Sequence, residues 1–369
     1  MQQNELNQTQ NENIDNNILS DSKSEKDKKN SRILSYLMFI INILIVLAIL
    51  YYNITQNKEF TPLRDLTFNL QYLFIIIAIT ILTTLLDTII TNLFVKTVTS
   101  KSNLWLSYKA FATMRYYDSI TPMGSGGQPF MATYLLSNNI SGSKSVSIPM
   151  KKFLTQQFSW LIITLVGLIY TLINKTITNP LIIGFSVFGF VINVFLDLFL
   201  FLGSSSEKIT KGFSVWSIKL LTKLKIIKNY DKALEKTSNF MKEYQELMKE
   251  FSSNKLQFVI ILIMGMIKYI LYFSIPFFIF CCFKGFDINL FLVFFTFTIM
   301  VELSASCFPL PGGSGMNEIT FSVLFSSYLP EAVFWAMLLW RIFSYYLLIF
   351  QGIIIMIIDL IFSNKKKLS

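Results

Sequence analysis

The sequence contains no histidine, three cysteines and few charges. Without histidine it cannot build a Ser-His-Asp triad, a histidine general base or a histidine metal site. The cysteines (Cys281, Cys282 and Cys307) lie in or beside apolar stretches and two of them are adjacent, which supports neither a zinc site nor a disulfide framework. We therefore expect no metal and no cofactor. Charged residues make up 15% of the 369 residues, whereas a soluble protein has about 25%.

Apolar residues are abundant instead. They make up 53% of the chain, and the mean hydropathy is +0.53. Runs of about 20 apolar residues recur, each long enough to cross a hydrocarbon core of about 30 Å. These runs predict an all-α integral membrane protein with six full spans, at residues 33–52, 71–95, 153–172, 181–202, 256–282 and 332–362.

Two further apolar regions are interrupted by proline and glycine. Region 104–136 is broken at 121–129 (TPMGSGGQP), and region 290–328 is broken at 308–318 (FPLPGGSGMNE). Proline lacks an N–H and glycine favours irregular backbone, so neither region can remain one helix. Each arm has about 11–17 residues, too short to cross comfortably. We expect two opposed re-entrant half-helix hairpins, because irregular backbone at membrane depth must be covered by protein or line a watery cavity.

The net charge of +10 arises from 32 basic and 22 acidic residues, and the lysines cluster beside apolar spans. Residues 204–255 contain eleven lysines and six acidic residues, and the chain ends with Lys365, Lys366 and Lys367. Lysine beside spans is the signature of cytoplasmic loops. We therefore expect a multi-pass protein of the cell membrane with both termini cytoplasmic, and no nucleic-acid partner.

These features divide the chain into five parts. A polar, disordered tail is expected at 1–32, and a first membrane repeat with hairpin 104–136 at 33–202. Basic amphipathic cytoplasmic helices are expected at 203–255. The rest of the second membrane repeat, with hairpin 290–328, occupies 256–362, and 363–369 is a basic tail.

The two breaks share a motif. Pro122-x-Gly-Ser-Gly recurs at Pro311, and 311 − 122 = 189. The spans before the breaks begin near residues 71 and 256, which are 185 apart, and those after them begin near 153 and 332, which are 179 apart. The halves enter the membrane in opposite senses. Inverted repeats with matching interrupted segments are typical of transporters whose site lies near the bilayer midplane.

Each glycine-rich break leads into a half-helix, whose first N–H groups have no helical partner and whose dipole is positive. Such a terminus is suited to phosphate. This predicts a substrate-binding site formed by Gly124, Ser125, Gly126, Gly127, Gln128, Gly312, Gly313, Ser314 and Gly315. The alternative is that these segments are helix breaks that serve packing alone.

Ionisable residues at membrane depth are costly and therefore candidates for function. Arg341 could bind phosphate bidentately, and Glu318 could recognise a cationic headgroup or stabilise its helix terminus. Asp87, Lys268 and Glu302 are candidates for proton or ion coupling. The structural alternative pairs Asp87 with Lys268, and Arg341 with Glu302 or Glu318. Arg115 and Asp118, on the arm before the first break, could line the same site.

The motifs at 309–318 (PLPGGSGMNE), 338–346 (LLWRIFSYY) and 121–130 (TPMGSGGQPF) resemble those of the lysylphosphatidylglycerol synthase transmembrane-region family. The likeness covers residues 33–362. The chain resembles the membrane half of the multiple peptide resistance factor, which moves aminoacylated phosphatidylglycerol across the bilayer. In bifunctional relatives a large cytosolic domain takes lysine from lysyl-tRNA. With seven residues after Phe362 and a longest loop of about 52 residues, we expect no such domain here.

The residues and the resemblance together predict a flippase-like transporter. It would move an anionic or aminoacylated phospholipid, or a polyprenyl-linked lipid, between leaflets. One alternative is a phosphatidylglycerol lysyltransferase, whose acid–base pair would be Glu318 with Asp118 or Glu302. Another is a membrane scaffold for a separately encoded lipid-modifying enzyme. The expected partner is therefore a membrane phospholipid, with or without such an enzyme.

Overall fold

A computed structural model describes residues 61–140, 142–205 and 255–368, together with scattered positions between 206 and 254. The expected first span, 33–52, and most of the basic segment 203–255 lie outside the described residues. The described parts are helical and contain no strand. The prediction of an all-α integral membrane protein is confirmed.

Ten α-helices and several single turns make up these parts. The helices are α2 (Leu70–Thr99), α3 (Leu104–Ile120), α4 (Gly127–Ser137), α5 (Gly142–Asn174), α6 (Pro180–Ser205), α9 (Lys255–Lys284), α10 (Phe291–Ala305), α11 (Met316–Phe325), α12 (Val333–Arg341) and α13 (Leu347–Leu368). The 3₁₀ turns are η1 (Leu63–Asp65), η2 (Pro122–Gly124), η3 (Ile288–Leu290) and η4 (Pro311–Gly313). A π-helical turn, η5 (Ile342–Tyr346), joins α12 to α13.

Six described segments are long and apolar enough to cross a membrane. Five of them correspond to expected spans: α2, Lys144–Asn174 of α5, Pro180–Leu198 of α6, α9, and Val333–Ile361. The sixth, Ile288–Ala305, is the first arm of the second broken region. At about 1.5 Å per residue its 18 residues span about 27 Å. Its re-entrant character therefore stays a prediction.

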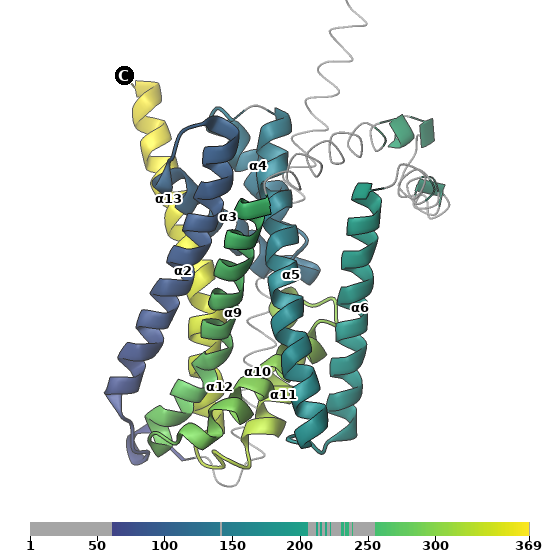
Figure 1. The fold of residues 1–369 in the computed structure, drawn as a ribbon. Coiled ribbons are helices and arrows are strands. Elements are labelled where there is room, and N and C mark those ends of the chain that lie inside the picture. Colours follow the sequence, from purple (N-terminus) through teal and green to yellow (C-terminus); the bar gives the residue numbers. More distant parts are fainter. Residues whose placement is uncertain are drawn as a thin grey trace, which may run out of the picture.

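The two broken regions form hairpins at opposite ends of the bundle. In Figure 1, α3 and α4 lie in the upper half, whereas α10 and α11 lie in the lower half. The arms of each hairpin pack against each other. The turns η2 and η4 also contact each other, so the two breaks meet inside the bundle. This is the arrangement that an inverted repeat requires.

Close helix contacts hold the hairpins in place. The helix α2 packs along α9, α13 along α3, and α10 along α6. Small residues permit these approaches: a Cβ on Gly265 of α9 would collide with Ser159 of α5, and one on Gly352 of α13 with Tyr116 of α3. An aromatic core around Phe294, Phe321 and other rings fills the lower half. Exposed leucines, isoleucines and phenylalanines cover the outer faces.

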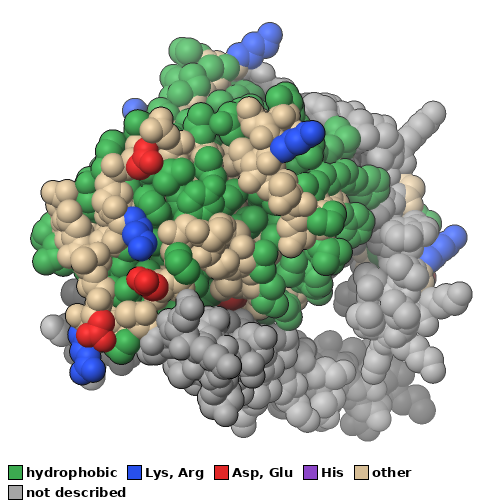
Figure 2. Space-filling model, turned by 90° about the horizontal axis from the view of Figure 1, so that it is seen from below, with side chains coloured by type: hydrophobic (Ala, Val, Ile, Leu, Met, Phe, Trp, Pro, Cys, Tyr) green, Lys and Arg blue, Asp and Glu red, His purple; other side chains and the backbone are tan. Residues whose placement is uncertain are grey.

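The two ends of the bundle differ in charge. Lys96, Lys101, Lys144 and Lys255 lie at the upper end, where α2 ends and α5 and α9 begin. At the lower end, basic and acidic side chains alternate among apolar ones (Figure 2). The described charged residues of its loops and helix ends are Arg64, Lys175, Lys284, Asp65, Asp287 and Glu331, which sum to zero. The positive-inside rule thus predicts that the upper end is cytoplasmic.

Cysteine accessibility in intact cells tests this orientation. Lys144 and Lys284 are both exposed and lie at opposite ends of the bundle. In a background with its three cysteines replaced by serine, Lys284→Cys should react with a membrane-impermeant maleimide. Lys144→Cys should react only after permeabilisation. If both positions react from the same side, the inverted arrangement in the membrane is wrong.

Candidate functional site

The first break is a tight turn with left-handed backbone. Met123 and Gly124 have φ values of +53° and +63°, and Pro122 fixes the φ of the turn's first position. The Gly124 N–H donates to the Thr121 carbonyl and the Ser125 N–H to the Pro122 carbonyl, both at 3.2 Å. A positive φ is costly for methionine, which sequence reasoning did not foresee. The turn therefore holds Met123 in a strained conformation.

The second break repeats this geometry 189 residues later. Gly312 and Gly313 have φ values of +59° and +61°. The Gly313 N–H donates to the Leu310 carbonyl at 3.1 Å, and the Ser314 N–H donates to the Pro311 carbonyl at 3.2 Å. Dihedral signs and hydrogen bonds thus match position by position up to the serine. The backbones then diverge, because Ser125 has a ψ of −13° and Ser314 a ψ of 144°, and Gly126 has a φ of −86° and Gly315 a φ of +88°. The first three positions of the shared motif therefore form one local structure twice.

A carboxylate caps the half-helix that follows each break. Asp118 Oδ1 accepts a hydrogen bond of 2.9 Å from the N–H of Gly127, the first residue of α4. Glu318 Oε2 accepts one of 2.6 Å from the N–H of Gly315, just before α11. Each acid neutralises the positive end of a helix dipole. Part of each predicted phosphate site is therefore already occupied by the protein's own oxygens.

Arg341 is engaged by the second hairpin. Its Nη2 lies 2.5 Å from Glu318 Oε1, and its Nη1 donates to the Gly312 carbonyl at 3.1 Å. Both charged residues are buried, at 5% and 1% exposure. The pair expected under the structural alternative is thus present. Whether Arg341 also contacts phosphate stays a prediction.

Tyr345, in the π-helical turn, ties the two breaks together. Its hydroxyl donates a 2.7 Å hydrogen bond to the carbonyl of Ser119, near the inner end of α3. Its ring lies where a Cβ on Gly312 would be. A π-helical turn shifts the register of the helix and is common at functional sites. The sequence offered no signal for this contact beyond a tyrosine that follows Arg341.

The other predicted binding residues lie around the first break and at the start of α11. Gly126 is buried, and its N–H donates to Thr121 Oγ1 at 2.9 Å. Ser125 is exposed and Gln128 half-buried, whereas Ser314 is buried. The structure therefore places the predicted binding residues in one region, where their side chains differ widely in solvent exposure. Their role in binding stays a prediction.

Two charged side chains near the breaks have no counter-ion in direct contact. Among the described residues, Arg115 of α3 forms no hydrogen bond and no ion pair through its guanidinium. Glu302 of α10 accepts one hydrogen bond of 2.8 Å, from the Tyr272 hydroxyl, and likewise forms no ion pair with any described residue. Both are half-buried, and the charge of Arg115 acts on Glu302. They can bind a ligand without breaking an existing ion pair.

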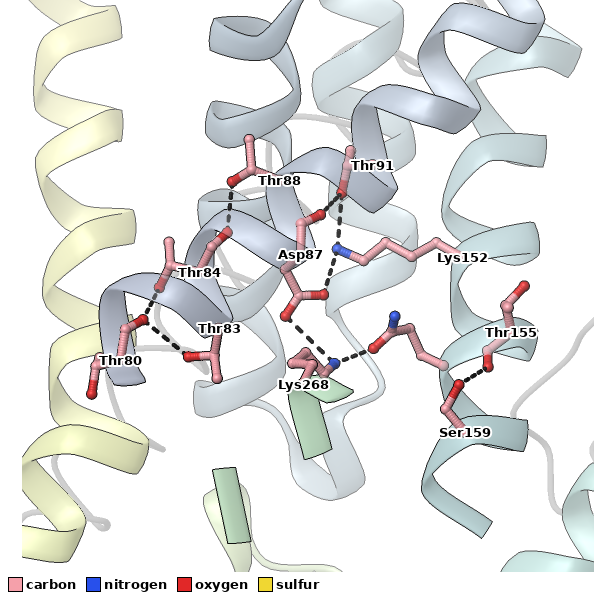
Figure 3. A network of polar contacts seen from close by, with 11 residues as sticks. Thr80, Thr83, Thr84, Asp87, Thr88, Thr91, Lys152, Thr155, Ser159 and Lys268 are labelled. Carbon is pink, nitrogen blue, oxygen red and sulfur yellow. Dashed lines mark hydrogen bonds and ion pairs between the residues drawn. The ribbon is translucent and has the colours of Figure 1, made fainter. Parts of the chain in front are cut away.

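Asp87, Lys152 and Lys268 form a second polar cluster on three helices (Figure 3). The Asp87 carboxylate lies 3.3 Å from Lys152 Nζ and 3.5 Å from Lys268 Nζ. Lys152 also donates to Thr91 Oγ1 at 2.9 Å, and Lys268 donates to Gln156 Oε1. The expected Asp87–Lys268 pair is therefore present. Sequence reasoning missed Lys152, because it sits in a lysine-rich stretch at the start of its helix.

The break conformation itself is testable through Gly312→Ala. Alanine is strained at a φ of +59°, and its Cβ would collide with the Tyr345 ring. We expect a loss of about 1–3 kcal/mol in the free energy of unfolding, read as a lower thermal midpoint in detergent. Gly142→Ala, at the start of α5 where no atom lies within 4 Å, is the matched control and should change little. Equal midpoints for the two variants would contradict this account.

Comparison with known proteins gives one positive result. The model of a family described as "Lysylphosphatidylglycerol synthase TM region" matches residues 37–352. No curated protein and no solved structure matches the chain. The matched range includes both breaks, both capping carboxylates and Arg341.

Proposed function

Because the chain belongs to the lysylphosphatidylglycerol synthase transmembrane-region family, we propose that it moves a phospholipid between the leaflets of its membrane. The family indicates a role in membrane-lipid biology. Lipid movement is supported by one feature above all: two inverted, glycine-broken hairpins meet inside the bundle, and charged side chains without a direct counter-ion lie beside them. This is the arrangement expected of a transporter with a central site.

The phosphate of the lipid would interact with Arg115 and with the half-helix ends. Arg115 lies five residues from the inner end of α3, about 8 Å along the axis, and its guanidinium is free for a bidentate contact. The N–H groups of Gln128, Met316 and Asn317, in the first turns of α4 and α11, are not used by the capping carboxylates. Glu302 could form an ion pair with the ammonium group of an aminoacylated headgroup.

Access from alternate sides would follow from rocking the two repeats about the contacts between them. The α2–α9 contact and the η2–η4 contact both join a first-repeat element to a second-repeat element. Arg341 fastens the second break from the side of α12, and Tyr345 joins that break to Ser119 of the first repeat. Such rigid-body motion around a fixed site is the general mechanism of inverted-repeat transporters.

The enzymatic alternative has weaker support in the geometry. A lysyl transferase needs an acid–base pair that can reach its substrate. Glu318 uses both oxygens on Gly315 and Arg341, and Asp118 caps α4. Asp118 and Glu302 each keep one oxygen that accepts no hydrogen bond from a described residue, but neither has a second acid or base in contact with it. The scaffold alternative predicts the same fold but no lipid exchange by the purified chain.

Lipid exchange in vesicles tests the proposal. The vesicles contain phosphatidylglycerol and phosphatidylcholine, with traces of acyl-chain-labelled phosphatidylglycerol. When the protein is present, label that begins in the inner leaflet should become accessible to a membrane-impermeant bleaching reagent added outside. Arg115→Gln should slow exchange by about tenfold or more, because a charge-assisted bond is worth about 1.5–3 kcal/mol. Arg64→Gln, at an exposed guanidinium, is the matched control and should leave the rate unchanged. An unaltered rate in Arg115→Gln, or no exchange by the wild type, would contradict the proposal.

A second assay separates the transporter from the lysyl transferase. Purified protein supplied with lysyl-tRNA and phosphatidylglycerol should form no lysyl lipid, since Glu318 is held by Gly315 and Arg341 and Asp118 caps α4. Mass spectrometry of the extracted lipids gives the readout, and a bifunctional relative serves as the positive control. Repeated turnover by this chain would establish the enzymatic alternative.

A further inference from the structure

Two lysines share one carboxylate in the cluster of Asp87, Lys152 and Lys268. All three residues are buried, with side-chain exposures of 11% for Asp87 and Lys268 and 2% for Lys152. With every group ionised, the cluster has a charge of +1. Each ionised residue at a helix centre costs about 2.5–3.5 kcal/mol on insertion scales. A buried ammonium group without its own counter-ion is therefore the most expensive member of the set.

The surrounding charges do not remove this surplus. Arg115 of α3 adds a further positive charge that acts on all three members, and Asp118 of the same helix lies within the field of Lys152 and Asp87. Tyr269 of α9 faces it with a neutral ring, which lies 4.1 Å from Lys268 Nζ. The ring of Phe111 lies 4.4 Å from Lys152 Nζ. These rings favour an ammonium group but supply no negative charge.

The two ion pairs of Asp87 also differ in what they connect. Lys152 on α5 belongs to the same repeat as Asp87 on α2, whereas Lys268 on α9 belongs to the other repeat. The helices α2 and α9 occupy equivalent positions in the two repeats and pack along each other. The Asp87–Lys268 pair thus crosses the contact about which the repeats would move.

We propose that this cluster is a proton-exchange site that couples lipid movement to a proton gradient. One N–H bond of an ammonium group breaks, the proton passes to water, and the electron pair stays on a neutral amine. Loss of a proton from Lys268 removes the ion pair between the repeats, while Lys152 keeps Asp87 neutralised. Reprotonation restores the pair. This inference rests on the proposed function for its coupling, whereas the proton site itself does not.

Nuclear magnetic resonance of protein labelled with lysine ¹³Cε measures the site directly. Loss of individual signals in Lys152→Met and Lys268→Met assigns the two residues. We expect Lys268 to lose its proton below about pH 10 in the purified protein without added lipid, because the one carboxylate of Asp87 cannot neutralise two buried ammonium groups. If Lys268 stays protonated up to about pH 10, the ordinary range of an exposed lysine, the proposal is wrong.

Vesicles with an imposed gradient then test the coupling. One pH unit should drive the leaflet ratio of the labelled phosphatidylglycerol up to about tenfold from unity, for one proton per lipid. Lys268→Arg retains its charge but cannot lose a proton, so this variant should exchange lipid without responding to the gradient. Lys144→Met, at an exposed position on α5, should respond like the wild type.

The outcomes separate the two proposals. If the wild type exchanges no lipid, the proposed function fails and the resonance experiment alone decides the proton site. If the wild type exchanges lipid but its leaflet ratio stays at unity under the gradient, the function stands and the coupling is wrong.

Discussion

Backbone groups in the interior of a membrane protein must find partners within the protein, and this constraint shapes the centre of the bundle. Two helices end there and two begin, at turns that cannot be helical because of proline and glycine. The turns use their own carbonyls for two N–H groups each. At the first break Thr121 Oγ1 and Asp118 accept from the next two N–H groups, and at the second Glu318 accepts from the next one. The Tyr345 hydroxyl donates to the carbonyl of Ser119.

Because some charged side chains are used to satisfy backbone groups, this constraint determines which charges remain available to bind a ligand. Glu318 uses both carboxylate oxygens, on Gly315 and Arg341, whereas Asp118 uses one oxygen to cap α4. Arg341 neutralises Glu318, which would otherwise be an isolated anion with 1% exposure. Arg115 and Glu302 are left without direct counter-ions, and the surplus positive charge lies on the cluster of Asp87, Lys152 and Lys268. The breaks thus have their backbone groups hydrogen-bonded, whereas Arg115 and Glu302 near them keep charges without a direct counter-ion. This combination is compatible with the proposed transporter.

Much of this was predictable from the sequence, and the limits have physical causes. The spans follow from the apolar runs, the breaks from proline and glycine, and their equivalence from the offset of 189 residues. The pairs Asp87–Lys268 and Glu318–Arg341 were among the structural alternatives, because buried charges require partners, and the sequence left open whether Arg341 pairs with Glu302 or with Glu318. The role of Lys152 was hidden, since lysines near helix ends usually reach water. The apolar segment at 288–305 is compatible both with a full span and with a hairpin arm, because its length does not distinguish these two structures.

The sequence by itself determined the membrane class, the family, the helix breaks and the polarity of the two ends. These properties depend on composition and on local backbone chemistry, and both are set by residues that are close together in the sequence. The tertiary structure alone decided that the breaks meet, that Tyr345 joins them, that Asp118 caps α4, and that one carboxylate serves two lysines. Those contacts depend on how helices far apart in the chain rotate and slide against each other. A rotation of about 100° around a helix axis changes which side chain faces inward. No local pattern encodes that choice.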